Sequence, residues 1–213
     1  MQTTSFKRYR PPALRAWHWL NALALLGTLG TVLLRKTFLS WRTNSAYIQG
    51  ELQEAGTTVT PELAKAIAVG LRDRMWEWHY IFGFTLAGLL VVRLLTWFFL
   101  PKDRSPPLMQ AIRAVATAPA GQKRSATHNA LVRTGYALFY ASLVFMATTG
   151  FLMYWKASLG LGEDLVHSIK DVHELMLWFF VVFAGGHVLG VVFAEHRGDA
   201  GIVSDMIQGG RRD

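Results

Sequence analysis

Four histidines lie at the ends of long apolar segments: His18, His79, His173 and His187. His173 and His187 bound the stretch HELMLWFFVVFAGGH, which contains a single charged residue between them. In an α-helix, 14 positions turn to within about 40° of four full turns and rise about 21 Å, so these two imidazoles would share one face at opposite ends of a helix. Imidazole is a common metal ligand, so all four are candidate ligands if the surrounding elements bring them together.

The elements that carry these histidines are expected to be membrane-spanning helices. The sequence has 213 residues, of which 52% are apolar and 13% aromatic, and its mean hydropathy is positive. A helix needs about 20 apolar residues to cross the hydrocarbon core of a bilayer. Such spans are expected at residues 17–35, 78–100, 131–155 and 172–194, with loops at 36–77, 101–130 and 156–171 and tails at 1–16 and 195–213. The sequence therefore predicts an all-α integral membrane protein folded as a four-helix bundle.

The composition limits which metal ligands the chain can supply and which partners its basic residues would bind. The formal net charge is +8, and the Lys and Arg residues gather at the ends of the apolar segments, where they would meet lipid headgroups. This distribution favours membrane lipid over nucleic acid as the partner of the basic residues. The chain contains no cysteine, which excludes disulfides, iron–sulfur clusters and covalently attached haem. Any bound metal must therefore use histidine or carboxylate ligands.

The distribution of Lys and Arg also predicts the topology. Lys and Arg residues are numerous in the N-terminal tail and in the loop at residues 101–130, and three Arg residues lie in the C-terminal tail, whereas the loop at residues 156–171 is slightly acidic. Cytoplasmic segments carry the excess of Lys and Arg, so both termini are expected in the cytoplasm. The loop at residues 36–77 also carries Lys and Arg, nearly balanced by acidic residues that count for little in this rule. An even number of spans with Lys and Arg in both tails nevertheless puts this loop on the periplasmic side. Within it, Thr60 and Pro61 predict the start of an amphipathic helix that leads into the second span.

This topology groups the four histidines into two pairs, and the members of each pair would lie at the same depth in the membrane. His79 and His173 would lie near the periplasm, and His18 and His187 near the cytoplasm. A bis-histidine haem iron takes one imidazole on either face of the porphyrin, so two such pairs in a four-helix bundle fit two stacked b-type haems. Zinc fits less well, because it needs about four ligands at one point and no further donor is level with either pair. Any one histidine at a helix end could instead be an interfacial residue, but this explanation suits a single residue better than the set.

Other polar residues near the two histidine pairs are weaker candidates for contacts with haem or quinone. Arg93 lies 14 positions after His79, and Arg15 lies one turn before His18, so either guanidinium could neutralise a haem propionate. Both could instead extend to lipid headgroups. His128, just before the third span, is a candidate ligand or quinone contact or else an interfacial residue. The two remaining histidines lie off the ligand face of the fourth span: His167 and His196.

Four stretches of the sequence resemble a known family. They are RAWHWLNALAL in the first span, WHYIFGFTLAGLLVVRLLTWFF in the second, TGFLMYW at the end of the third and VHELMLWFFVVFAGGH in the fourth. Over nearly the whole chain, they resemble the bacterial di-haem cytochrome b561 family, which includes the cytochrome b subunits of nickel–iron hydrogenases. The resemblance implies a place in the bacterial inner membrane, and implies that the first, second and fourth helices supply the haem ligands His18, His79, His173 and His187. The long first loop and the tail EHRGDAGIVSDMIQGGRRD are similar to those of subunits that work beside a partner.

The resemblance implies a protein that transfers electrons across the membrane between a periplasmic redox partner and the quinone pool. The expected cofactors are two haem b groups, the expected substrate is quinone, and the expected partner is a periplasmic redox protein or catalytic subunit, with a homodimer left open. The alternative is a stand-alone superoxide:quinone oxidoreductase, in which Lys65, Arg72 and Arg74 would form a basic funnel beside His79. A third hypothesis, of another class, is a cofactor-free transporter or structural anchor.

Overall fold

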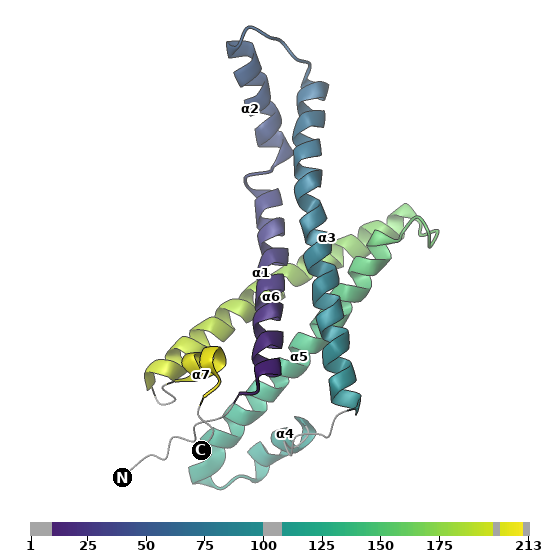
Figure 1. The fold of residues 1–213 in the computed structure, drawn as a ribbon. Coiled ribbons are helices and arrows are strands. Elements are labelled where there is room, and N and C mark those ends of the chain that lie inside the picture. The colour runs from purple at the N-terminus through teal and green to yellow at the C-terminus, as the bar shows by residue number, and fades with distance from the viewer. Residues whose placement is uncertain (1–9, 100–107, 198–200, 211–213) are drawn as a thin grey trace. The chain divides into compact units, whose positions relative to one another are not determined.

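The computed structural model describes residues 10–99, 108–197 and 201–210, and the regular structure of these residues is helical, as predicted. In chain order the elements are α1 (Pro12–Lys36), α2 (Trp41–Glu54), α3 (Pro61–Phe99), α4 (Leu108–Thr117), the short 3₁₀ helix η1 (Ala120–Gln122), α5 (Lys123–Tyr154), α6 (Glu163–Arg197) and α7 (Ile202–Gln208) (Figure 1). The chain divides into two compact units, Met1–Leu86 with Ala184–Asp213, and Ala87–Phe183. Helices α3 and α6 run through both units.

Four helical segments are long and apolar enough to cross a membrane, which confirms the predicted number of spans. Many large apolar side chains along them are exposed, among them Val182 at 72% and Leu189 at 71%. An apolar surface of this extent requires lipid around it. The protein is therefore a multi-pass membrane protein, with candidate spans Pro12–Lys36, Pro61–Phe99, Ala120–Tyr154 and Glu163–His196.

Three of the helices begin well before the apolar spans expected from the sequence. α3 starts at Pro61 rather than at residue 78, so the amphipathic segment of the first loop and the second span form one helix of 39 residues. Its start has the predicted chemistry, because the Leu63 N–H donates to the Thr60 hydroxyl at 3.2 Å and proline occupies the first helical position. α5 and α6 likewise begin at Lys123 and Glu163. Hydropathy therefore marks the apolar part of each helix rather than its length.

In the first unit, α1 and α3 pack against each other in antiparallel directions. A Cβ placed on Gly27 of α1 would lie 2.7 Å from the Phe82 ring of α3, so the helices approach where glycine has no side chain. One turn further along α1, Thr31 contacts His79, which lies one turn back along α3. A step of four residues along α1, from Gly27 to Thr31, corresponds to a step of three residues back along α3, from Phe82 to His79. Both steps are about one helical turn, so the same face of each helix stays in contact with the other.

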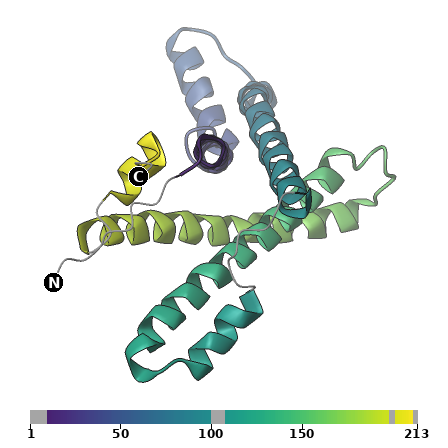
Figure 2. The same cartoon turned by 60° about the horizontal axis from the view of Figure 1, so that its bottom comes forward.

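The first loop forms a helical hairpin, because α2 lies beside the N-terminal part of α3 (Figures 1 and 2). The Lys65 ammonium lies 4.7 Å from the centroid of the Trp41 ring, a cation–π contact that joins the two helices. Ala64 and Ala68, one turn apart on α3, are fully buried, as expected where small side chains let another helix approach closely. The sequence does not predict α2.

In the second unit, α5 packs against the first part of α6, and α4 lies along α5 (Figure 2). Phe139 of α5 stacks on Phe183 with 4.6 Å between ring centroids, and meets Phe180 edge-on at 5.9 Å. Phe180 is almost completely buried. The turn between the two helices contains Gly160 with φ of +61°, a left-handed conformation that favours glycine.

The C-terminal helix α7 returns to the start of α1 (Figure 2). The Arg10 N–H donates to the Gly209 carbonyl at 2.9 Å, and the Trp19 indole N–H donates to the Met206 carbonyl at 3.1 Å. Glycines in the left-handed conformation flank this short helix, since Gly201 and Gly209 have φ of +103° and +101°. The two described ends of the chain therefore lie at the same end of α1.

Candidate functional site

His18 of α1 and His187 of α6 are brought together within the first unit. Their ring centroids lie 6.1 Å apart, and the ring planes are inclined by 58°. A metal–nitrogen bond to histidine is about 2 Å long and the ring centroid lies ~1 Å behind the nitrogen, so two imidazoles on opposite sides of one ion have centroids roughly 6 Å apart. These two rings therefore have the spacing of two ligands on one metal ion.

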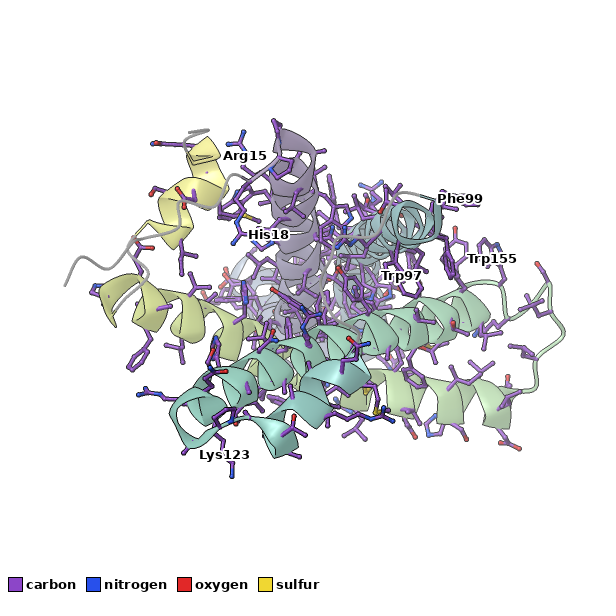
Figure 3. The ribbon with its side chains drawn as sticks, turned by 90° about the horizontal axis from the view of Figure 1, so that it is seen from below. Arg15, His18, Trp97, Phe99, Lys123 and Trp155 are labelled. Carbon is purple, nitrogen blue, oxygen red and sulfur yellow. The ribbon has the colours of Figure 1, made fainter. Side chains whose placement is uncertain are left out.

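Two polar atoms beside this pair are buried and have no hydrogen-bond partner among the described residues: Arg15 Nε and Asn21 Oδ1. Both residues lie one turn from His18, on either side of it along α1. Arg15 is also held by the C-terminal segment, because Nη1 donates to the Ile207 carbonyl at 2.6 Å. Figure 3 shows Arg15 and His18 at the end of α1 that lies beside α7. A buried donor and a buried acceptor thus flank His18, and buried polar groups of this kind usually bind a ligand or water.

His79 of α3 is held by α1 and by its own helix. Its Nδ1 lies 2.9 Å from the hydroxyl oxygen of Thr31, a buried residue of α1. Its ring also stacks on Trp76, one turn earlier, with 4.2 Å between centroids and 7° between planes. The Arg35 guanidinium lies over the same indole at 4.3 Å. These contacts restrict the orientation of the imidazole.

His173 of α6 is held in a matching way by α5. Its Nδ1 lies 2.7 Å from the hydroxyl oxygen of Thr149, which is buried. A Cβ placed on Gly150 would lie 3.6 Å from His173 Cε1, so the α5 backbone runs close to the ring. A histidine that binds a metal through one nitrogen commonly uses the other for a hydrogen bond that orients the ring. Thr31 and Thr149 therefore form the same kind of hydrogen bond with Nδ1 of His79 and of His173.

The other residues singled out in the sequence lie at exposed positions of their helices. Arg93 and His128 are exposed, on α3 and α5 respectively. His167 is 3.5 Å from an aspartate carboxylate of its own helix, and His196 Nδ1 is 2.8 Å from a backbone carbonyl one turn earlier. His167 and His196, which the sequence puts off the ligand face of the fourth span, thus interact with groups of their own helix.

Two of the three basic residues proposed as a funnel near His79 already have partners. Arg72 donates to the Asp73 carboxylate at 2.9 Å, and Lys65 lies over the ring of Trp41. Both residues belong to the segment of α3 that precedes the apolar span. The positive charge of Arg72 is partly offset by its neighbour, which weakens the attraction of this surface for a small anion.

Comparison with known proteins identifies the family. The sequence profile of prokaryotic cytochrome b561 matches residues 9–209, which is nearly the whole chain. The chain belongs to the prokaryotic cytochrome b561 family. This confirms the resemblance drawn from the four stretches of sequence in the predicted spans.

Two relatives carry the name "Probable Ni/Fe-hydrogenase B-type cytochrome subunit". The protein from Cupriavidus necator is 28% identical over 219 residues, which cover 95% of this chain and 85% of the relative. The protein from Azotobacter vinelandii is 25% identical over 225 residues, which cover 95% of this chain and 87% of the relative. No solved structure matches the chain significantly.

Membership of the cytochrome b561 family implies haem b and electron transfer in a membrane. The residues around His18 fit this group, because paired imidazoles in an apolar setting suit a haem iron and the buried Nε of Arg15 suits an anionic or carbonyl oxygen. When bound, haem supplies one-electron chemistry, and the protein holds it, orients it and adjusts its potential.

In the sequence, nothing marks the following as residues of the site: Thr31, Thr149, Asn21 and Trp76. The signal that could have found the two threonines is a polar side chain inside an apolar span. That signal is weak in a sequence, because a helical threonine commonly satisfies its hydroxyl by bonding a carbonyl of its own helix. Trp76 resembles an ordinary aromatic residue of the membrane interface.

Proposed function

We propose that this protein is a di-haem electron-transfer subunit of the bacterial inner membrane, which carries electrons between a periplasmic redox partner and quinone. The observation that carries the proposal is the 6.1 Å separation of the His18 and His187 rings in a chain of the cytochrome b561 family. Two residues 169 positions apart in the sequence meet at the spacing of two ligands on one iron. In this proposal they hold one haem b, here called the inner haem.

His79 and His173 hold a second haem b, the outer haem. Support comes from their buried threonine partners, since each histidine uses Nδ1 for a hydrogen bond, as ligand histidines commonly do. His173 and His187 are 14 positions apart on α6, which corresponds to about 21 Å of helix rise. In the proposed arrangement the four spans form a bundle with the two haems stacked along it.

Both termini are placed in the cytoplasm. The Lys and Arg residues of the N-terminal tail favour this side, and the hydrogen bond from Arg10 to Gly209 holds the two described ends of the chain together at one end of α1, so the two ends are expected on the same side. His18 lies near the same end of α1, so the inner haem is the one near the cytoplasm and the outer haem is the one near the periplasm.

The partner is a periplasmic catalytic subunit of the nickel–iron hydrogenase type. This proposal rests on the relatives, which are named as hydrogenase cytochrome subunits and match this chain along 95% of its length. The hairpin formed by α2 and the start of α3 offers the docking surface, because it continues beyond the apolar part of the second span. Electrons would then enter at the outer haem and leave at the inner one.

Quinone is reduced beside the inner haem. Reduction to quinol takes up two electrons and two protons, so a quinone site needs a donor for the carbonyl and an acceptor for the hydroxyl. Arg15 Nε and Asn21 Oδ1 are a buried donor and a buried acceptor of this kind, one turn on either side of His18. Arg93 and His128 remain candidate contacts from the sequence, and Arg15 is also the candidate for binding a haem propionate.

The test begins with the purified full-length protein. We expect a reduced-minus-oxidised spectrum with b-type bands, two haems per chain, and quinone reduction that depends on the periplasmic partner and its electron donor. A protein without b-type bands would overturn the proposal. Rapid quinone reduction by superoxide, in the absence of any partner, would favour the stand-alone oxidoreductase.

A further inference from the structure

The buried hydroxyl group of Thr31 makes two short contacts. Its Oγ1 lies 2.7 Å from the carbonyl oxygen of Thr28 in its own helix and 2.9 Å from Nδ1 of His79 in α3. At these distances each contact needs a hydrogen between the two atoms. A carbonyl has no hydrogen to give, so the single hydroxyl hydrogen must point to it. The hydrogen of the other contact must then come from His79, which donates its Nδ1–H to the hydroxyl oxygen.

Thr149 repeats this arrangement on a different pair of helices. Its hydroxyl donates to the carbonyls of Phe145 and Met146 at 2.9 and 3.2 Å, and its Oγ1 lies 2.7 Å from Nδ1 of His173. The hydroxyl hydrogen is again engaged within its own helix. His173 is therefore the donor in the contact with Thr149, also through Nδ1–H.

The hydrogen bonds decide which nitrogen of each ring is unprotonated. A neutral imidazole carries one N–H, so a ring that donates from Nδ1 has its lone pair on Nε2. A metal binds the unprotonated nitrogen. We infer that Thr31 and Thr149 are positioning residues that hold His79 and His173 in the tautomer whose Nε2 can bind the outer haem iron. This inference rests on the proposed function, since it takes these two histidines as haem ligands.

Neighbouring threonines show that this contact is specific. Thr28 and Thr148 donate to carbonyls one turn earlier, at 2.8 and 2.9 Å, and neither forms a hydrogen bond with a histidine among the described residues. Thr148 is exposed, whereas Thr149 beside it is buried against His173. Carbonyl bonding is thus common to all of these threonines, while the histidine contact belongs to two of them. Thr28 and Thr148 are the matched controls.

The same hydrogen bonds should affect the redox potential of the outer haem. An acceptor at Nδ1–H makes the imidazole a more basic ligand, and a more basic ligand stabilises the oxidised, more positively charged iron. Removing the acceptor should therefore raise the midpoint potential of the outer haem. The inner haem should keep its potential.

The experiment compares Thr31→Val and Thr149→Val, which lose the hydroxyl at nearly constant volume, with Thr31→Ser and Thr149→Ser, which keep it. The purified full-length proteins are titrated electrochemically, and their oxidised haems are examined by electron paramagnetic resonance. We expect each valine variant to raise one of the two midpoint potentials and to shift the g-values of one haem. The serine variants, Thr28→Val and Thr148→Val should match the wild type.

The other possible results of this experiment also support or overturn the role of the two threonines. Valine variants that bind both haems with wild-type potentials and g-values would overturn the inference and leave the di-haem proposal standing. Valine variants that lose a haem would support it if serine restores that haem, and would overturn it if serine does not, because the methyl packing would then be responsible. Retention of both haems by His79→Ala and His173→Ala would remove the ligand assignment and the inference with it.

Discussion

At the scale of residues, the histidines differ in what holds them. His79 is oriented by a hydroxyl group and by a stacked indole, and His173 by a hydroxyl group and a close backbone. The His18 and His187 rings lie 6.1 Å apart between centroids, the spacing of two ligands on one ion. Each pair contains two ligands of one proposed haem, so the loss of either member should affect that haem alone.

Replacement of single histidines tests this division. We expect His79→Ala or His173→Ala to lose the outer haem, and His18→Ala or His187→Ala to lose the inner haem, because each removes one of two axial ligands. The haem-to-protein ratio should fall by about half in each variant, and the remaining haem should keep its potential. His167→Ala, at an exposed position paired with an aspartate, is the control. Full haem content in all four variants would contradict the assignment.

At the scale of elements, the approach of α1 to α3 governs the contact between Thr31 and His79. Gly27→Ala would place a methyl group 2.7 Å from the Phe82 ring, so the ring or the helix must shift. Overpacking of this kind costs about 1–3 kcal/mol. We expect lower thermal stability, measured by loss of haem absorbance on heating, and weaker retention of the outer haem than of the inner one.

The control for this prediction is Gly30→Ala, because a Cβ at Gly30 would meet no described atom within 4 Å. It should leave both stability and haem retention near the wild-type values. Equal effects of the two substitutions would show that helix contact at Gly27 is not the cause.

The hairpin of α2 and the start of α3 carries an exposed apolar stripe. Leu63, Ile67 and Leu71 recur every four residues along α3 and are 51%, 41% and 54% exposed. An exposed apolar stripe that precedes the apolar part of the helix, at residues 78–100, suits a protein partner. We expect simultaneous replacement of the three residues by glutamine to reduce co-purification with the periplasmic subunit at least tenfold, roughly the loss of one or two interface anchors. The haem spectrum should not change.

Replacement of Gln53 and Glu54 by alanine, at exposed positions of α2, is the control for the hairpin. Deleting residues 50–58 should act like the glutamine variant. If deletion removes the haems as well, the hairpin supports the folded protein rather than the partner.

At the scale of the whole molecule, the proposed path runs from the periplasmic partner through the outer and inner haems to quinone on the cytoplasmic side. A photoreactive quinone analogue should label residues near His18, Arg15 and Asn21, where buried polar atoms lack partners among the described residues. Asn21→Leu should reduce quinone reduction while both haems remain reducible. Labelling near His173 and the first loop instead would place the quinone on the periplasmic side.

The sequence alone determined the class of the protein. Four apolar segments were sufficient to predict an all-α membrane protein and its number of spans, because these features depend on local composition and helical periodicity. The family came from the resemblance of four stretches of the sequence, which the comparison with known proteins confirmed. The bounds of the helices were less predictable. α3 begins at Pro61 because its cap and helix propensity precede the apolar part, whereas hydropathy detects only the apolar part.

Only the tertiary structure decided which residues meet. Helical periodicity gives the face on which a residue lies, but it does not say which side chain of another helix reaches that face. Thr31 and His79 are 48 positions apart, and Thr149 and His173 are 24 apart, so their hydrogen bonds depend on how the helices pack. The approach of α1 to α3 at Gly27, the 6.1 Å spacing of His18 and His187, and the return of α7 to α1 have the same origin. All of these are contacts between distant segments, set by the close packing of side chains rather than by local sequence.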